Sequence, residues 1–520
     1  MTDRGYPKGT HPMRAVFVLF DSLNRHALGC YGGAGIATPN FDRFAARAVT
    51  FDNHYVGSLP CMPARRDMHT GRLNFMHRSW GPLEPFDNSM PDMLRQAGVH
   101  SHLISDHFHY FEDGGATYHS RYKTWEFIRG QEYDPWIAMV EPPLDRFKAM
   151  YSDKHYNVPT EPKRRQHQIN REKIRAEEDF PGPACFARAF AFLDDNRDAD
   201  NWFLQLECFD PHEPFFAPEK YREPYRTGYN GPILDWPKYA PVKESPEEIA
   251  EIRANYAALV AMCDAWFGKL LDYFDAHDLW RDTCLVLTTD HGFLLAEHDW
   301  WGKNLTPYYE EISHIPLILH HPGHAGRAGQ RVAALTQTTD LMPTFLEIFG
   351  QPIPAEVTGR SILPLIEGAE GPSALAFGMF GGPIGVTDGE YSYFRYPADL
   401  FDERLGEYTL IPTHMTGFFT LKELATGRMA GPFDFTKGQK LIRYDALNEA
   451  RRPPGLDGTR FVAFDSAVYH NATDPHQLHP IRDAAVEARL SAEILRILRA
   501  HDAPPEYFAW MGLDAPHGHD

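Results

Sequence analysis

Short apolar runs alternate with amphipathic stretches along most of the chain, and this alternation restricts the possible folds more than any other feature. Strands are predicted for MRAVFVLFD (13–21), NWFLQLECFD (201–210) and DTCLVLTTDHG (282–292), and helices for TPNFDRFAARAV (38–49), with an N-cap at its start, and for 247–278. SMPDMLRQAGVHSHLISD (89–106) predicts a helix, a glycine turn and a strand. This order is typical of an α/β fold, so we expect a large, mainly parallel sheet sandwiched by helices.

The last part of the chain has a different pattern. Its short candidate strands are ALAFGMF (374–380), YSYFRY (391–396) and RFVAFD (460–465), and a final helix is predicted for AAVEARLSAEILRILRAHD (484–502). We therefore predict a main α/β domain over 1–375 and a smaller C-terminal α+β subdomain, with a small antiparallel sheet and the terminal helix, over 376–520. Residues 110–180 are rich in aromatic residues, His, Arg and Pro without periodicity, and we expect them to be an insertion over the strand ends.

Charge and cysteine usage exclude several classes of protein. The formal net charge of −20 argues against a nucleic-acid partner, because binding a phosphate backbone needs clustered Lys and Arg. The N-terminal sequence MTDRGYPKGTHPMRAVFVLF has an apolar run too short for a signal peptide or a membrane span, so a cytoplasmic location without membrane association is expected. The six cysteines lack CxxC spacing, and Cys208 and Cys284 lie in apolar runs, where buried strand residues are expected.

Acidic residues follow three of the predicted strands. Asp21 ends the first, Asp210 with His212 follows the second, and Asp290 with His291 follows the third. In open α/β sheets ligands bind beyond the carboxyl ends of the strands, where distant residues can meet at one metal ion. A single strand-end aspartate more often caps the next helix, so the argument depends on these residues occurring together with Cys61.

Cys61 lies in SLPCMPARRDMHTGR (58–72), whose CMPAR and TGR match the CxPxR…TGR signature of the sulfatases. Other motifs follow in the family's order, namely DPHEP (210–214) and TTDHG…WGK (288–303), after the earlier TPNFDRFA; NATDPHQL near the C-terminus is a weaker echo. The chain therefore resembles a formylglycine-dependent sulfatase of the alkaline phosphatase superfamily, and the resemblance extends to about residue 365. It implies that residues 1–375 form a sulfatase-like catalytic domain.

In that family the cysteine is oxidised after synthesis to formylglycine, which implies a formylglycine-generating enzyme as a maturation partner for Cys61. The chemistry agrees, because a thiolate attacks a sulfate ester poorly, whereas an aldehyde hydrate offers one oxygen to a metal and another as nucleophile. The simpler alternative is an ordinary cysteine without this role. The resemblance also implies that Arg65 holds the hydrate and offsets negative charge, with a surface ion pair as its alternative.

The metal site implied by the resemblance consists of Asp21, Cys61, Asp290 and His291. It departs from the commonest sulfatase pattern, because Ser22 follows Asp21 where many sulfatases have a second aspartate, and His291 stands where they have asparagine. The phosphonate monoester hydrolases, a branch of the same superfamily, also look like this. One carboxylate fewer and one imidazole more shift the preference from calcium toward manganese or zinc, so we expect one Mn²⁺, with Ca²⁺ or Zn²⁺ as alternatives. Ser22 and Asn24 are candidates either to support this site or to cap turns.

Two further residues resemble the family's proton donor and anion-binding group. His212 in DPHEP is expected to protonate the leaving-group oxygen as the ester bond breaks. Lys303 in WWGKN resembles the lysine that contacts the transferred oxyanion and the leaving group, which makes it both a catalytic and a substrate-binding candidate. A solvated surface lysine is the simpler alternative.

The segment SDHFHY (105–110) lies where sulfatases carry a Lys-x-His pair, but the lysine is absent here. The candidates for the base that expels the oxyanion and restores the aldehyde are therefore Asp106, His107 and His109. The spacing favours His109 as the catalytic residue, and His107 is then a candidate for substrate binding.

The residues together predict a metal-dependent hydrolase of sulfate monoesters with a small-molecule or carbohydrate substrate. A phosphonate monoester or phosphodiester hydrolase is the main alternative, and some promiscuity is expected, because metal-assisted attack at sulfur and at phosphorus needs similar groups. A non-catalytic binding protein of the same fold is the third hypothesis. Tyr110, Tyr118 and Trp125 either stack on a sugar or aryl group or pack the 110–180 segment against the core. The end of the chain, EYFAWMGLDAPHGHD, is a candidate interface for a homo-oligomer.

Overall fold

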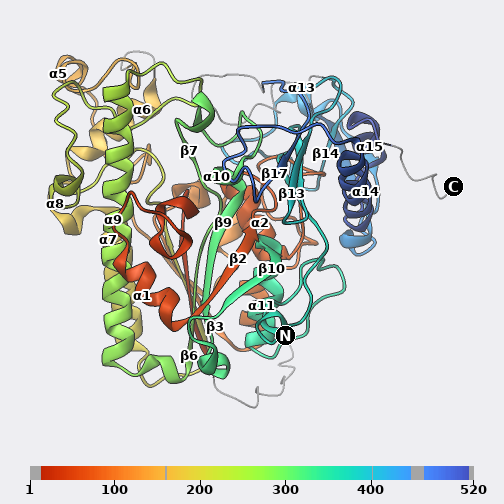
Figure 1. Cartoon of the computed structure of the whole chain (residues 1–520), viewed down its shortest axis with the longest axis horizontal. Helices are drawn as coiled ribbons and strands as arrows, with labels where there is room; N and C mark the ends of the chain where they lie inside the picture. The colour runs from red at the N-terminus through yellow and green to blue at the C-terminus, as the bar shows by residue number, and fades with distance from the viewer. Residues whose placement is uncertain (1–12, 158–160, 401, 447–461, 514–520) are drawn as a thin grey trace.

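The computed structural model describes residues 13–157, 161–400, 402–446 and 462–513, and an eight-stranded sheet lies at its centre (Figure 1). The strand order is β10-β2-β9-β6-β1-β5-β3-β4. The strands are β1 (Arg14–Phe20), β2 (Val49–Tyr55), β3 (His100–Ser105), β4 (Thr124–Phe127), β5 (Trp202–Cys208), β6 (Thr283–Thr289), β9 (His314–His320) and β10 (Arg331–Gln337). All neighbouring pairs are parallel except those of β9, which is antiparallel to β2 and β6. The predicted α/β fold with a mainly parallel sheet is confirmed.

The central strand β1 explains why the sheet is covered on both faces. Its even-numbered residues from Val16 to Phe20 pack into one apolar core, and its odd-numbered residues from Ala15 to Leu19 pack into another. The register pairs Phe20 with Cys208 of β5 and with Thr289 of β6. Asp21 follows β1 and Asp290 follows β6, so both residues lie at the same edge of the sheet. The tertiary structure therefore brings these two acidic residues together.

Two groups of helices supply these cores. The helices of the first core are α1 (Pro39–Arg47), α7 (Pro181–Asp195) and α9 (Pro246–Ala276), and those of the second are α2 (Cys61–Thr70), α3 (Met90–Gln96) and α11 (Leu341–Ile348). Figure 1 shows α1 and α9 on one side of the sheet and α2 and α11 on the other. The predicted strands 13–21, 201–210 and 282–292 and the predicted helix 247–278 are confirmed, and so are the buried positions of Cys208 and Cys284.

Helix α1 is capped differently from the prediction. Thr38 precedes its first turn, but the Thr38 hydroxyl accepts a hydrogen bond from the Gly29 amide at 2.9 Å and none from the helix. The carboxylate of Asp264 in α9 accepts from the amides of Asn40 and Phe41 at 3.0 and 2.9 Å. The expected local N-cap is therefore wrong, because a residue from a distant helix satisfies these donors.

Two smaller antiparallel sheets form the C-terminal region. One has the order β11-β12-β13-β17, and the other β14-β16-β15. Their strands are β11 (Leu375–Gly378), β12 (Ile384–Thr387), β13 (Tyr391–Arg395), β14 (Gly406–Thr409), β15 (Arg428–Ala430), β16 (Leu441–Asp445) and β17 (Ala467–His470). The predicted terminal helix is α14 (Ala484–Ala500), which contacts the first of these sheets.

The predicted strand 460–465 is wrong where it can be compared. Residues 462–465 are not in a strand, and β17 begins at Ala467, where pairing with Phe394 of β13 starts. Residues 460 and 461 lie outside the described part of the chain. The apolar pattern indicated a strand here, but pairing with β13 places it a few residues later.

The 110–180 segment is more regular than the sequence predicts. It includes β4, which pairs with β3 at the edge of the large sheet, and three helices, α4 (Ala116–His119), α5 (Leu144–Met150) and α6 (Pro162–Arg171). β4 has only four partly exposed residues, so its pattern was too short to predict.

The end of the chain packs inward. Helix α15 (Pro505–Trp510) buries Tyr507, Phe508 and Trp510 in an apolar core, so these aromatic side chains are not available for the expected interface, and residues 514–520 lie outside the described residues. None of the helices in the described part of the chain combines the length and apolar character that a membrane span needs. Residues 1–12, on which the expected location partly depends, are outside the described residues as well.

Candidate active site

Cys61 is the first residue of α2, at the edge of the sheet where β1 and β6 end. The following residues are helical as far as Thr70, and Gly71 ends the helix in the left-handed conformation with φ of 66°. The Cys61 side chain is buried, with Sγ 3.3 Å from His291 Nε2 and 3.4 Å from Lys303 Nζ. Burial, and next the charge of Asp21, raise the pKa of the Cys61 thiol well above its ordinary value. The side chain is therefore a thiol and not a thiolate.

Three other buried donor residues lie around this sulfur. Ligand atoms of Asp21, Cys61, Asp290 and His291 all lie within 4.8 Å of one another. His291 donates its Nδ1 proton to the Gly292 carbonyl at 3.0 Å, which leaves Nε2 free to act as a ligand. Burial, and next the neighbouring Asp21, raise the pKa of Asp290 to about 7. Two buried carboxylates that repel one another beside a free imidazole nitrogen fit a divalent cation.

Arg65 holds these carboxylates in place. Its guanidinium donates to Glu207 Oε1 at 2.7 Å, Asp290 Oδ2 at 2.7 Å and Asp21 Oδ2 at 3.0 Å, and also to the Cys61 carbonyl at 2.9 Å. The side chain is fully buried and does not line the neighbouring cavity. The structure therefore gives Arg65 a positioning contact with the ligand set rather than the surface ion pair that was its alternative.

Glu207 is a residue that the sequence reasoning missed. It lies in β5, is completely buried and accepts from Arg65 and from Tyr110 Oη, the latter at 2.8 Å. A charged residue inside the apolar run NWFLQLECFD was the signal that could have revealed it, because a buried carboxylate needs a partner.

Lys303 reaches the same site from the position directly after β8 (Trp301–Gly302). Its Nζ donates to Ser22 Oγ at 3.1 Å and lies 3.8 Å from Asp21 Oδ1, and the Ser22 hydroxyl donates to Asp21 Oδ1 at 2.8 Å. Burial opposes the charge on Lys303, but the neighbouring carboxylate of Asp21 raises its pKa above the ordinary value. Lys303 is therefore a buried cation next to the donor cluster. Ser22, with φ of 61°, supports the site, whereas Asn24 pairs with the backbone of Phe293.

A cavity of about 160 Å³ opens on this cluster. Its lining residues are Pro60, Cys61, Trp80, His109, Glu132, Tyr133, Lys163, His212, Glu213, Tyr239, Lys303 and Asn304. Glu132, Tyr133 and Lys163 come from the 110–180 segment and were not singled out from the sequence. Glu132 is buried and its Oε2 has no hydrogen-bond partner among the described residues. The cavity wall thus offers a buried acceptor to a bound molecule.

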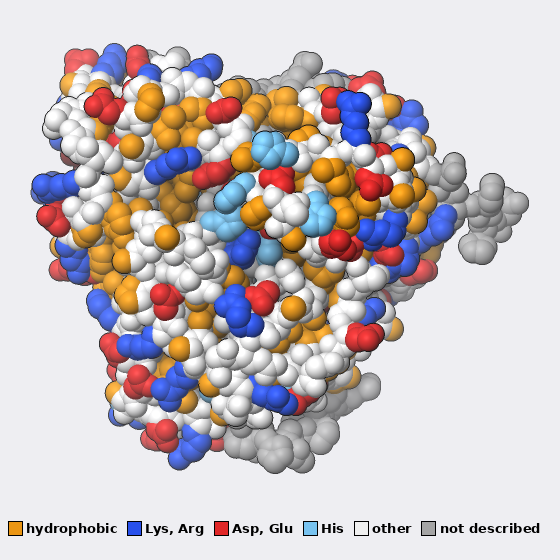
Figure 2. Space-filling model, viewed as in Figure 1, with side chains coloured by type: hydrophobic (Ala, Val, Ile, Leu, Met, Phe, Trp, Pro, Cys, Tyr) orange, Lys and Arg blue, Asp and Glu red, His pale blue; other side chains and the backbone are white. Residues whose placement is uncertain are grey.

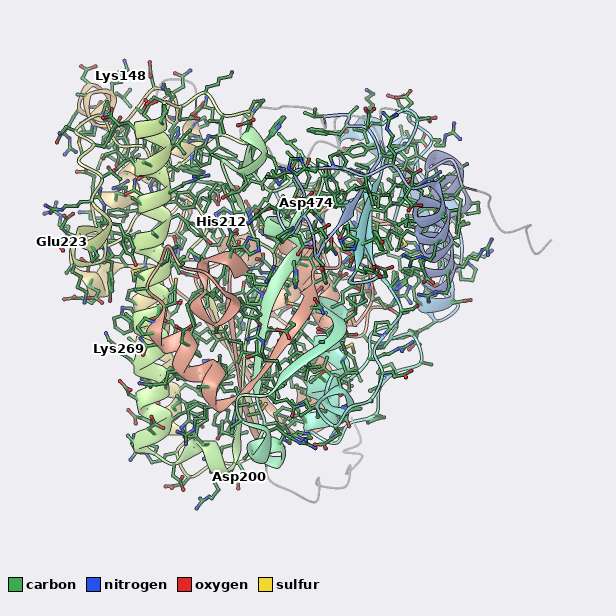
Figure 3. The ribbon with its side chains drawn as sticks, in the orientation of Figure 1. Lys148, Asp200, His212, Glu223, Lys269 and Asp474 are labelled. Atoms are coloured by element: carbon green, nitrogen blue, oxygen red, sulfur yellow. The ribbon has the colours of Figure 1, made fainter. Side chains whose placement is uncertain are left out.

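His212 lies in this wall, near the upper end of the sheet in Figure 3. Its Nδ1 donates to the Glu213 carbonyl at 2.5 Å. Burial, and next Lys303, lower the pKa of His212 well below its ordinary value. The ring is therefore neutral, with a lone pair on Nε2. Glu213 in turn accepts from Tyr239 Oη at 2.5 Å, and burial raises its pKa to about 7.

The three candidate bases lie in different surroundings. Asp106 accepts from the Phe209 amide at 2.7 Å and from Gln131, and does not line the cavity. His107 Nε2 is 3.6 Å from Asp21 Oδ2, so this ring faces the donor cluster. His109 lines the cavity, with Nδ1 2.5 Å from Glu112 Oε2.

The aromatic residues proposed for stacking do not line the cavity. Tyr110 and Tyr118 are buried in the core, and Trp125 is 45 % exposed. For these residues the structure favours packing, which was the alternative to a role in substrate binding. The aromatic residues that do line the cavity are Trp80, Tyr133 and Tyr239.

The family model described as Sulfatase matches residues 14–351. The chain is 27% identical over 395 residues to the multifunctional alkaline phosphatase superfamily protein PehA of Trinickia caryophylli, covering 65% of this chain and 72% of that protein. It is 25% identical over 434 residues to an N-acetylglucosamine-6-O-sulfatase of Bacteroides thetaiotaomicron, covering 74% of each. The phosphonate monoester hydrolase of Agrobacterium radiobacter has a similar fold, with a TM-score of 0.64, 17% identity and coverage of 94% of this chain and 96% of that one.

Proposed function

The chain belongs to the sulfatase family, and we propose that it hydrolyses sulfate monoesters with a formylglycine that is formed from Cys61. The observation that carries the proposal is the position of the Cys61 sulfur, which lies among Asp21, Asp290 and His291 at the floor of a cavity. As a buried thiol, Cys61 is a poor nucleophile, and conversion by a formylglycine-generating enzyme would supply the oxygen nucleophile that this chemistry needs.

A divalent cation would be held by Asp21, Asp290 and His291, together with the side chain of residue 61. When bound, it would supply Lewis-acid polarisation of the oxygens around it. Two carboxylates and one imidazole favour Mn²⁺, and Ca²⁺ and Zn²⁺ are the alternatives. Arg65 contributes by holding both carboxylates in a fixed orientation.

Lys303 binds the anionic group of the substrate. Its charged Nζ lines the cavity 3.4 Å from Cys61 Sγ, where negative charge develops on the oxygens of the transferring group. The Ser22 hydroxyl accepts a hydrogen bond from Lys303 Nζ and donates one to Asp21, which keeps Nζ at this position. The donor is thereby oriented before the substrate arrives.

His212 protonates the leaving alcohol. The ring is neutral in the free chain, and its Nδ1 proton is directed at the Glu213 carbonyl, so the free nitrogen is Nε2. The negative charge of a bound sulfate ester raises the proton affinity of this nitrogen, and a proton on Nε2 can then pass to the leaving oxygen. The negative charge of the ester also offsets the lowering of the His212 pKa by Lys303.

His109 is the base that we assign to release of the oxyanion. It is the only one of the three candidates among the residues that line the cavity in the described part of the chain. Because Nδ1 faces the carboxylate of Glu112, the Nδ1 proton is directed away and Nε2 carries the lone pair that a base needs. His107, which faces Asp21, is left to orient that carboxylate.

The cavity favours a substrate whose alcohol part carries hydrogen-bond donors. Glu132 and Glu213 are buried carboxyl groups in the wall, and Trp80 and Tyr133 offer apolar faces beside them. A carbohydrate presents both hydroxyl donors and an apolar ring face. The N-acetylglucosamine-6-O-sulfatase among the relatives supports a small-molecule or carbohydrate sulfate ester as substrate.

A phosphonate monoester or phosphodiester is the second candidate substrate. Ser22 in place of a second aspartate and His291 in place of asparagine are departures from the commonest sulfatase pattern that resemble the phosphonate monoester hydrolases. The description of the relative PehA as multifunctional supports activity toward more than one ester class.

The test begins with the mass of the proteolytic fragment that carries Cys61, from protein produced with a formylglycine-generating enzyme. Replacement of sulfur and two hydrogens by one oxygen supports the proposed nucleophile, and the Cys61→Ala fragment is the unreactive control. An intact thiol in protein that still hydrolyses sulfate esters overturns it. The ratio of kcat/KM for an aryl sulfate to that for the matching aryl phosphonate then decides between the two substrate classes.

A further inference from the structure

A second group of metal-ligating residues lies at the junction with the C-terminal region. His26 in η1 (Arg25–Ala27), Glu311 in α10 (Glu310–Ser313) and His476 in the loop after β17 offer ligand atoms that all lie within 4.8 Å of one another. None of them belongs to the Cys61 cluster. Figure 2 shows histidine side chains gathered near the middle of the viewed face, and Asp474, labelled in Figure 3, marks the loop that carries His476.

Glu311 is the residue that points to a missing partner. Its side chain is only 3% exposed, and neither carboxylate oxygen has a hydrogen-bond partner among the described residues. The adjacent Glu310 shows the contrast, because it accepts from Tyr55 Oη at 3.1 Å and is paired with His314. A buried carboxylate without donors is strongly unfavourable, so a cation is the simplest group to complete its surroundings.

Imidazole rings surround this carboxylate. His476 Nδ1 is 3.6 Å from Glu311 Oε1, and His298 Nε2 is 3.5 Å from Oε2. The His298 ring is fixed by stacking on Tyr309 at 3.6 Å between centroids. The rings of His26 and His476 meet edge to face at 5.5 Å. The distances from Glu311 to His476 and to His298 are too long for hydrogen bonds and leave room for an ion between these side chains.

Arg25 is a cation next to this group that could compete. Its guanidinium donates to His26 Nε2 at 3.0 Å, which shows that this nitrogen carries a lone pair. Arg25 also lies 3.6 Å from Glu310 Oε2, so its charge stays compensated when it releases His26. His26 can therefore exchange a hydrogen bond for a metal bond.

We propose that His26, Glu311 and His476 form a second divalent-metal site, selective for Zn²⁺ or a similar first-row ion. Two imidazoles and one carboxylate are a typical zinc ligand set, and water or His298 completes the coordination. His298 otherwise orients Glu311 from outside the coordination sphere. His26 and Glu311 belong to the predicted sulfatase-like domain and His476 to the C-terminal region, so a bound ion links the two parts of the chain.

The site has a structural role. Gln477, next to His476, already accepts from the Glu310 amide at 3.1 Å, so the loop is docked before any ion binds. His476 is 62% exposed, which gives an ion access from solvent. Binding to the folded chain alone raises its stability by mass action.

The experiment counts metal ions in the matured protein after equilibration with Zn²⁺ and removal of free ion. The wild-type chain is expected to retain one divalent ion more than the His476→Ala variant, and Zn²⁺ is expected to raise Tm more in the wild type than in that variant. His479→Ala is the matched control, because it removes an exposed histidine from the same loop. Equal ion counts and equal Tm responses in wild type and His476→Ala overturn the proposal.

A second variant keeps the test decisive. Glu311→Gln preserves the shape of the side chain but removes the charge, and it is expected to abolish the extra ion while the circular dichroism spectrum is unchanged. Since the readout is metal content and Tm rather than hydrolysis, failure of the Cys61-based proposal leaves this result intact. Retention of the extra ion by Glu311→Gln contradicts the assignment.

Discussion

His212 shows at the scale of one residue how surroundings decide chemistry. Its Nδ1 proton is committed to the Glu213 carbonyl, and Lys303 adds to the effect of burial in keeping the free ring neutral. The histidine can act as an acid only after an anion binds. Its contribution therefore depends on how much the leaving alcohol needs a proton.

We predict that His212→Gln lowers kcat/KM by about 10²–10⁴-fold for alkyl or carbohydrate sulfates, whose alkoxides are poor leaving groups. For 4-nitrophenyl sulfate, whose leaving group departs unprotonated, the loss is expected to be small. The measurement is kcat/KM over a series of leaving-group pKa values. An equal loss across the series would contradict the role of proton donor and indicate a positioning role.

Arg65 and Glu207 show the limit of local spacing at the same scale. The motif around Cys61 was visible in the sequence, but the contact of Arg65 with Glu207 joins residues 142 positions apart. An arginine side chain reaches several possible partners, and only packing selects among them. The sequence therefore identified Arg65 as a site residue expected to hold the hydrate, without identifying its three carboxylate partners.

At the scale of an element, the start of helix α1 is stabilised by a residue that is distant in the sequence. Its amphipathic pattern predicted the helix, but its N-terminal amides are satisfied by Asp264 from α9. Asp264 is only 3% exposed, and burial raises its pKa from 3.8 to about 6. The carboxyl therefore binds its proton more tightly in the folded chain than in the unfolded chain.

This shift predicts a pH dependence of stability. Between about pH 4 and pH 6 the unfolded chain has released the Asp264 proton while the folded chain retains it, so the free energy of unfolding falls as pH rises, by on the order of 2 kcal/mol. Asp264→Asn removes this contribution, so its Tm relative to wild type is expected to increase from pH 4 to pH 7. Asp272→Asn, on an exposed part of the same helix, is the control. A Tm difference between Asp264→Asn and wild type that does not change with pH contradicts the prediction.

The whole molecule is held together by a core that both predicted domains share. Tyr55, Leu59 and Phe75 pack in one apolar cluster with residues of β11–β13, α14 and α15. Arg72 donates to the His501 carbonyl at 3.3 Å, and His77 is 2.8 Å from the Asp502 carbonyl. The sequence boundary at 375 falls at the first residue of β11, at the edge of this cluster.

We predict that a chain ending at residue 375 aggregates, because it exposes the half of this cluster that the C-terminal region covers. Full-length protein is expected to unfold in one calorimetric transition, since the described residues of both parts share one apolar core at the junction. Scanning calorimetry and gel filtration measure both expectations. A monomeric truncated chain with a sharp transition of its own would show that the two parts are independent domains.

The sequence by itself determined the strands β1, β3, β5 and β6 with the helices α1, α3 and α9, the acidic ends of β1 and β6, and the motif around Cys61. These features depend on periodicity and on short spacing, which a linear chain displays directly. Tertiary structure alone decided which side chains meet: Asp264 with α1, Arg65 with Glu207, and Glu132 with the cavity. The proximity of His26, Glu311 and His476 was likewise decided only by the tertiary structure. The hydrophobic pattern of a sequence shows which face of a helix or strand is buried, but not which distant residue packs against that face.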